Sequence, residues 1–266
     1  MSKRDDLVGA LDRDGVLAGI RWAFTSAADR VMEDFSEAAG HDATWVGVTR
    51  FTLFRDRLDR VFSCRRYAIA DGMDGRLSLD ILHAELSERD VYTFPILDPD
   101  LVVRADLSGS SGWSHGHTRW LLASSAFGKL DELPWPQKSS TKQLVAQQST
   151  DEPQELTLFD QFAEEEAFGL GALIAKTKLD LHTLVVGHSL DAEHGGRELV
   201  VGQPRLNSDG GSAWYWNHNL LQGPSLDGGR RQQLVPASVA PDTTPDAPVK
   251  LRRPAAKQSG REQVEL

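Results

Sequence analysis

The first hydrophobic pattern along the chain repeats at three- and four-residue steps. Between residues 16 and 39 the apolar positions fall on one side of a helix, and the charged positions fall off that stripe. Gly40 follows, where a glycine commonly ends a helix. A second stripe, which includes Phe54 and Leu58, predicts a helix from about Ala43 to Tyr67. We therefore expect an N-terminal helical hairpin.

The middle of the chain carries short apolar runs between turn residues. Leucines at helical spacing predict a short helix within residues 79–86. Residues 91–94, 100–104 and 120–123 are rich in branched and aromatic side chains, which favours strands. Glycine and serine between residues 108 and 112 indicate a turn. This region therefore predicts short strands, mostly antiparallel.

The hydrophobic pattern changes again between residues 182 and 218. A branched run at 182–190 is followed by a Gly-Gly pair and a second run at 197–203. Another Gly-Gly pair leads into the aromatic run at 213–217. Such runs, separated by glycine turns, are typical of an antiparallel meander. We expect three consecutive strands here.

These patterns predict an α+β fold in four segments. Residues 1–136 form the helical pair and short strands, and the polar stretch 137–154 forms a linker or mobile loop. Residues 155–221 hold a helix at about 155–170 and the C-terminal three-strand meander, either as a second unit or as one domain with residues 1–136. Residues 222–266, dominated by Gly, Pro, Gln, Ser and charge, are expected to be a disordered tail.

Composition predicts a cytoplasmic protein. The chain lacks the run of ~18 apolar residues that a membrane span requires. It has no secretory signal pattern, and its single Cys64 cannot form an internal disulfide. Arginine outnumbers lysine 21 to 8, a bias that resembles proteins of GC-rich bacterial genomes.

The charge of the chain bears on its partners. A formal charge of −10 disfavours nucleic-acid binding. The basic stretch Lys250–Arg261 of the tail could add only weak attraction to a polyanion. Another protein is therefore the partner that we expect, and no membrane contact is expected.

One short stretch carries a possible catalytic serine. Residues 184–191 resemble the strand and nucleophile turn of the α/β-hydrolase family, whose motif is Gly-x-Ser-x-Gly. Gly187 matches the first glycine and Ser189 matches the nucleophile, whereas Asp191 stands in place of the second glycine. The resemblance implies a serine hydrolase that uses Ser189. The alternative is a hairpin strand that reverses just after Leu190.

Two histidines suggest a possible metal site. His115 and His117 lie one residue apart, so on a strand both imidazoles would face one divalent metal. With the glycine-rich stretch before them they resemble part of the first cupin motif, although Leu121 or Leu122 stands in the place of the glutamate ligand. A metal bound by His115 and His117 would make the protein a metal-dependent hydrolase. The alternative is that the two histidines lie in a solvated loop between strands. The further ligands would come from Asp106, His188 or His218.

Arginines and tryptophans are the candidate partner-binding residues. Six arginines and two aspartates lie between Arg50 and Arg66. They predict either a helix that pairs its own charges, as in Arg55–Asp59 and Asp56–Arg60, or a surface for a protein or, less readily, a nucleic acid. Two tryptophans share one strand face, which suits either the core or an interface. The candidate set is Arg55, Arg57, Arg60, Arg65, Arg66, Trp214 and Trp216.

The leading hypothesis is a non-enzymatic bacterial regulatory or accessory protein that acts by protein–protein contact without a cofactor. It follows from the segregated charges, the aromatic strand and the incomplete catalytic patterns. The metal-dependent hydrolase and the serine hydrolase remain the alternatives.

Overall fold

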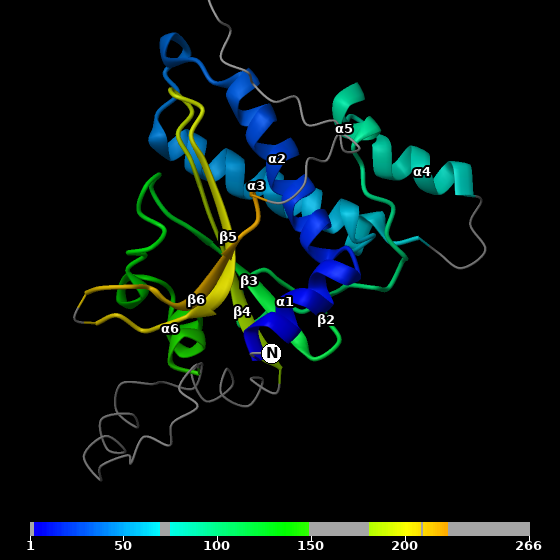
Figure 1. Ribbon diagram of the computed structural model, residues 1–266. Coiled ribbons are helices and arrows are strands. Elements are labelled where there is room, and N and C mark those ends of the chain that lie inside the picture. The colour runs from blue at the N-terminus through cyan, green and yellow to red at the C-terminus, as the bar shows by residue number, and fades with distance from the viewer. Residues whose placement is uncertain (1–2, 70–74, 149–180, 209, 223–266) are drawn as a thin grey trace, which may run out of the picture. The chain divides into compact units, whose positions relative to one another are not determined.

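The computed structural model describes residues 3–69, 75–148, 181–208 and 210–222 (Figure 1). Contacts divide the chain into units 1–229 and 230–266, so the described residues all belong to the first unit. The described helices are α1 (Lys3–Arg13), α2 (Val16–Asp34), α3 (Ala43–Val61), α4 (Gly75–His83), α5 (Glu88–Tyr92) and α6 (Ser140–Gln147). Short 3-10 turns are η1 (Glu37–Ala39), η2 (Arg65–Tyr67) and η3 (Trp135–Gln137). The strands are β1 (Val103–Arg104), β2 (Gly112–His115), β3 (Thr118–Ser124), β4 (His182–Leu190), β5 (Arg197–Pro204) and β6 (Trp214–Asn219).

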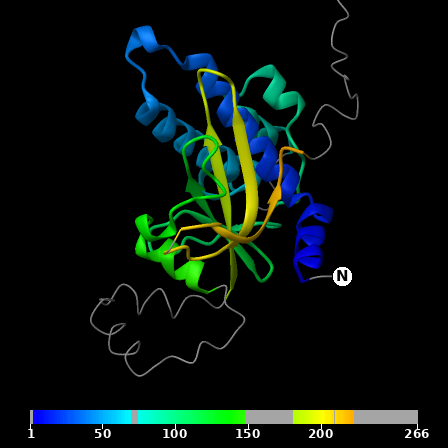
Figure 2. The ribbon, with the colours of Figure 1, turned by 60° about the vertical axis from the view of Figure 1, so that its left-hand side comes forward.

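The described strands form one six-stranded sheet in the order β1-β2-β3-β4-β5-β6. All neighbours are antiparallel except β3 and β4, which are parallel. A parallel pair needs a long crossover connection, and this one passes through η3 and α6. The β4–β6 meander confirms the strand prediction for the C-terminal half. Figure 2 shows β4 and β5 as a long yellow hairpin.

The sheet is buried on both faces by alternating side chains. On β3, Trp120 and Leu122 join the core that contains α1, α2 and α3, whereas Leu121 and Ala123 join the core beneath η3 and α6. Strands β4 and β5 alternate in the same way. This two-sided burial explains why β4 reads as a nearly continuous apolar run rather than as alternating polar and apolar residues.

The predicted helical hairpin is present as α2 and α3. Helix α2 ends earlier than predicted, at Asp34, and η1 follows it. Gly40 takes a positive φ of 84°, which glycine adopts without strain. Asp42 then caps α3, because its side chain accepts a hydrogen bond from the Trp45 N–H at 2.8 Å. Helix α1 was not predicted.

Two local predictions are wrong. Residues 91–94 are not a strand: Ser87 caps the short helix α5, and Phe94 then turns into the core against Trp22. Residues 140–147, expected to be linker, form α6, whose Val145 and Ala146 are buried under the sheet. The helix predicted at 155–170 and the tail from residue 223 lie outside the described residues. Among the helices described, none is long and apolar enough to cross a membrane.

Candidate binding site around Arg57

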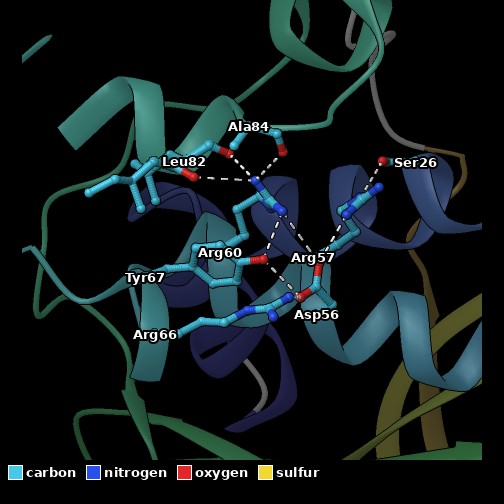
Figure 3. A network of polar contacts seen from close by, with 9 residues as sticks. Ser26, Asp56, Arg57, Arg60, Arg66, Tyr67, Leu82 and Ala84 are labelled. Carbon is cyan, nitrogen blue, oxygen red and sulfur yellow. Dashed lines mark hydrogen bonds and ion pairs between the residues drawn. The ribbon is translucent and has the colours of Figure 1, made fainter. Parts of the chain in front are cut away.

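The polar face of α3 carries a network centred on Asp56 (Figure 3). The Asp56 carboxylate accepts hydrogen bonds from Arg57 Nη1 and Tyr67 Oη, both at 2.9 Å, and from Arg66 Nη2. Arg60 adds an ion pair at 3.7 Å, as the four-residue spacing predicted. Burial raises the pKa of Asp56, but the hydrogen bonds from Tyr67 and Arg66 and the Arg60 charge outweigh burial. The pKa therefore stays below its usual value, and Asp56 remains ionised.

The Arg60 guanidinium donates hydrogen bonds to groups within the protein. Its Nη1 donates to the carbonyl oxygens of Leu82 at 2.7 Å and Ala84 at 2.9 Å, and its Nη2 donates to Tyr67 Oη at 2.7 Å. These carbonyls lie at the C-terminal end of α4, which leaves its last carbonyls unpaired within the helix. Arg60 thus fixes the end of α4 and the segment that follows it.

Arg57 lies one helical turn before Arg60, at a groove of about 320 Å³. Its side chain is only 9% exposed. Its Nε donates to Ser26 Oγ of α2 at 3.0 Å, and Nη1 is held by Asp56. Its Nη2 makes no hydrogen bond to any residue that the structure describes, so it is available to a ligand. The groove is lined by Asp29, Arg30, Glu33, Arg57, Glu85, Leu86, Ser87, Arg89 and Asp90.

The groove contains both signs of charge. Arg89 pairs with Asp29 at 3.3 Å, and Arg30 pairs mainly with Asp34 at 2.8 Å. The Glu85 side chain has no ion-pair partner among the described residues. Glu85 also has a φ of 61°, an uncommon conformation for a residue other than glycine. The groove therefore suits a polar partner with charges of its own.

Two exposed apolar residues follow the groove along the chain. Tyr92 is 84% exposed and Ile96 is 86% exposed. Phe94, between them, packs edge-on against Trp22 with ring centroids 4.7 Å apart and against His83 at 5.1 Å. Because Phe94 is anchored inward, Tyr92 and Ile96, each two residues away from it in the chain, are held on the surface. We call the groove residues together with Tyr92 and Ile96 the α5 surface.

The residues of the predicted partner-binding set differ in their exposure. Arg60 is buried, and both of its terminal nitrogens already donate hydrogen bonds within the protein. Trp214 is a core residue: it is 4% exposed, its Nε1 donates to the Leu130 carbonyl at 2.8 Å, and its ring packs edge-on against Trp135. Arg57 is also buried and can reach a ligand only through the groove. The second tryptophan, Trp216, is half-buried and donates to Gln203 Oε1.

The other three arginines of the set remain partly accessible. Arg55 is half-buried and lies over the Phe51 ring at 6.0 Å, and Arg65 and Arg66 are exposed. Each exposed guanidinium is paired, Arg65 with Asp106 and Arg66 with Asp56. The predicted Arg55–Asp59 pair is replaced, because the Asp59 carboxylate accepts from Trp113 Nε1 at 3.0 Å and pairs with Arg104.

The two histidines of the metal hypothesis do not converge. The His115 ring lies between the Leu101 carbonyl, 2.9 Å from Nδ1, and Asp14 Oδ2, 2.8 Å from Nε2. His117 is exposed on the β2–β3 turn after Gly116, so the expectation of one shared strand face is wrong. Within the described residues, no group of three or more His, Cys, Asp or Glu side chains is placed to hold a metal ion.

The structure also overturns the catalytic interpretation of Ser189. The chain reverses after Leu190, which pairs with Arg197 across the β4–β5 hairpin. No helix follows the serine at this turn, whereas a nucleophile elbow requires one. Ser189 is fully buried, and its hydroxyl donates to the cross-strand carboxylate of Glu198 rather than to a histidine.

Comparisons with known proteins add no family to this description. No protein-family model, no curated protein and no solved structure matches the chain.

The α5 surface was missed by sequence reasoning, which read residues 91–94 as a strand. The alternation of Tyr92, Phe94 and Ile96 was visible, but which of them faces the core depends on Trp22, far away in the sequence.

Proposed function

We propose that this chain is a non-enzymatic binding protein that contacts another protein through the α5 surface. The observation that carries the proposal is the outward display of Tyr92 and Ile96 on either side of the anchored Phe94. Aromatic residues and arginines contribute most of the energy at the centres of protein interfaces. Here the aromatic residue Tyr92 follows the groove residue Asp90 by two positions in the chain, and Nη2 of the buried Arg57 in that groove makes no hydrogen bond to a described residue. A regulatory or accessory role in a bacterial cytoplasm fits the composition.

A protein partner accounts for both halves of the α5 surface. Exposed apolar side chains gain free energy when a partner removes them from water. The Phe94 contacts hold this segment in place before binding, which lowers the entropic cost of association. The charged groove residues would surround the apolar contacts and select the partner by charge.

The experiment places a photo-activatable phenylalanine analogue at Tyr92 of the full chain, in cells that normally make the protein. We expect a discrete cross-linked product that disappears when Ile96→Asp is added. Once the partner is identified, Tyr92→Ala is expected to weaken its affinity by about 2 kcal/mol, roughly 30-fold.

The matched control carries the same analogue at Val48, which is 63% exposed on α3 and lies outside the α5 surface. The proposal is wrong if Tyr92 gives no discrete product or if Val48 gives the same one. It is also wrong if the product survives Ile96→Asp.

A further inference from the structure

Several charged side chains that line the groove at Arg57 are already paired. Asp29 pairs with Arg89 at 3.3 Å, and Arg30 pairs with Asp34 at 2.8 Å. Glu33 lies 3.9 Å from the same arginine. The charge that a ligand can use therefore lies on the other lining residues.

The Arg57 guanidinium is fixed in one orientation. This group is planar, and two of its three nitrogens are held: Nε donates to Ser26 Oγ at 3.0 Å, and Nη1 donates to Asp56 at 2.9 Å. The third nitrogen, Nη2, therefore cannot turn without breaking one of these bonds. The side chain is only 9% exposed and lines the groove. Nη2, which makes no hydrogen bond within the described part of the chain, thus offers a charged donor that is ordered before a ligand binds.

Two carboxylates of the groove lining are also without an ion-pair partner among the residues that the structure describes. They belong to Glu85, which is exposed, and to Asp90 of α5, which is half-buried. An unpaired carboxylate attracts a basic side chain, although salt weakens the attraction at an exposed position. The groove therefore offers a buried donor to a negative group and carboxylates to a positive group.

The segment between α4 and α5 is held in place without a partner. The Ala84 carbonyl accepts a hydrogen bond from Arg60 at 2.9 Å. The Asp90 N–H donates to Ser87 Oγ at 3.1 Å, and the Asp90 carbonyl accepts from Trp22 Nε1 of α2 at 3.2 Å. A groove whose sides are fixed in this way loses little conformational entropy on binding. It also selects a ligand by the positions of its charges.

We propose that the groove receives a segment of the partner protein that carries one acidic and one basic side chain. This inference rests on the proposed function of the α5 surface and names the groups that the partner presents there. The acidic side chain accepts a hydrogen bond from Arg57 Nη2, and the basic side chain pairs with Glu85. A purely acidic segment would be repelled by Glu85 and Asp90, and a purely basic one would be repelled by Arg57.

Selection of random peptides, displayed on phage, against the immobilised full chain tests this proposal without a known partner. We expect the enriched peptides to carry an acidic and a basic residue at a constant spacing. The dissociation constant of a synthetic peptide of this class should rise at least about tenfold with Arg57→Lys, because one ammonium cannot replace three fixed guanidinium nitrogens. It should rise about threefold or more with Glu85→Gln.

The matched control is Glu132→Gln, which neutralises an exposed carboxylate outside the α5 surface. It should change the dissociation constant less than about twofold. Exchange of charges gives a second test. A peptide whose basic residue is replaced by glutamate should lose its affinity for the unaltered chain and recover it with Glu85→Lys. Thermal unfolding without peptide confirms that each variant folds.

The proposal is overturned if no peptide is enriched, or if the enriched peptides bind the Arg57 and Glu85 variants as tightly as the unaltered chain. A cross-link at Tyr92 together with either result would refute the groove chemistry and leave the proposed function standing. Peptides that depend on Arg57 and Glu85, without any cross-link at Tyr92, would support the groove chemistry and refute only the proposed function.

Discussion

At the scale of single residues, His188 is the most unusual side chain. It is completely buried on β4, among the rings of Phe24, Phe51 and Phe54. Neither ring nitrogen has a hydrogen-bond partner among the described residues. Burial holds the pKa of His188 well below its usual value, and the charge of Arg50 adds to the effect. The ring is therefore neutral in the folded protein.

This burial predicts acid sensitivity. Because the pKa is depressed only in the folded state, the unfolded chain takes up a proton at His188 first. The free energy of unfolding then starts to fall near pH 6.5, by about 1.4 kcal/mol for each further pH unit, until the folded pKa is reached. His188→Leu should remove this loss of stability. Urea unfolding at pH 7.5 and at pH 5.5 gives the free energy of unfolding at each pH, and the difference between the two values measures the loss.

The control for the His188 substitution is a substitution of the exposed histidine His117. His117→Gln changes an exposed residue of the β2–β3 turn and should leave the acid loss unchanged. An equal acid loss in the chain with leucine at position 188 would contradict the prediction.

At the scale of elements, a single arginine of α3 holds the end of α4. Arg60 Nη1 contacts the carbonyl oxygens of Ile81, Leu82 and Ala84. Helix α4 is short, so it depends on contacts outside itself. The segment that follows α4 lines the groove at Arg57, so the network on α3 also positions the α5 surface.

Removal of the Arg60 donors should loosen α4 before the rest of the fold. Arg60→Met keeps much of the side-chain volume but leaves buried carbonyls and Asp56 without this partner, at a cost of about 3 kcal/mol in the free energy of unfolding. Hydrogen–deuterium exchange should rise more in residues 79–86 than in α2. The exposed Arg65→Met should cost less than about 0.5 kcal/mol. Equal exchange in both regions would show that α4 does not depend on Arg60.

The sequence predicts elements where the signal is local. The stripes of α2 and α3 and the glycine turns of the meander depend on neighbouring residues, and the structure contains them. The strand prediction for residues 91–94 was wrong because their branched and aromatic side chains favour a strand, whereas the Ser87 cap begins a helix. The groove was not predictable, since Arg57 meets Ser26 and the segment 85–90 only in the tertiary structure.

At the scale of the whole molecule, two hydrophobic cores share one sheet. Leu121 and Leu122 are adjacent on β3, yet Leu121 packs into the core beneath α6 and Leu122 into the core beneath α2 and α3. Both are almost completely buried. The parallel β3–β4 pair lies in the middle of the sheet, so neither core can come apart without disturbing strands that the other needs.

This sharing predicts a single unfolding transition for the described cores. Leu121→Ala and Leu122→Ala should each lower the free energy of unfolding by about 2–5 kcal/mol, because each leaves a cavity in a packed core. Circular dichroism of the backbone and fluorescence of the tryptophans should give the same urea midpoint in both variants, since Trp120 belongs to one core and Trp135 to the other. If Leu121→Ala separated the two signals while Leu122→Ala did not, the face beneath α6 would unfold independently, and the sheet would not couple the cores.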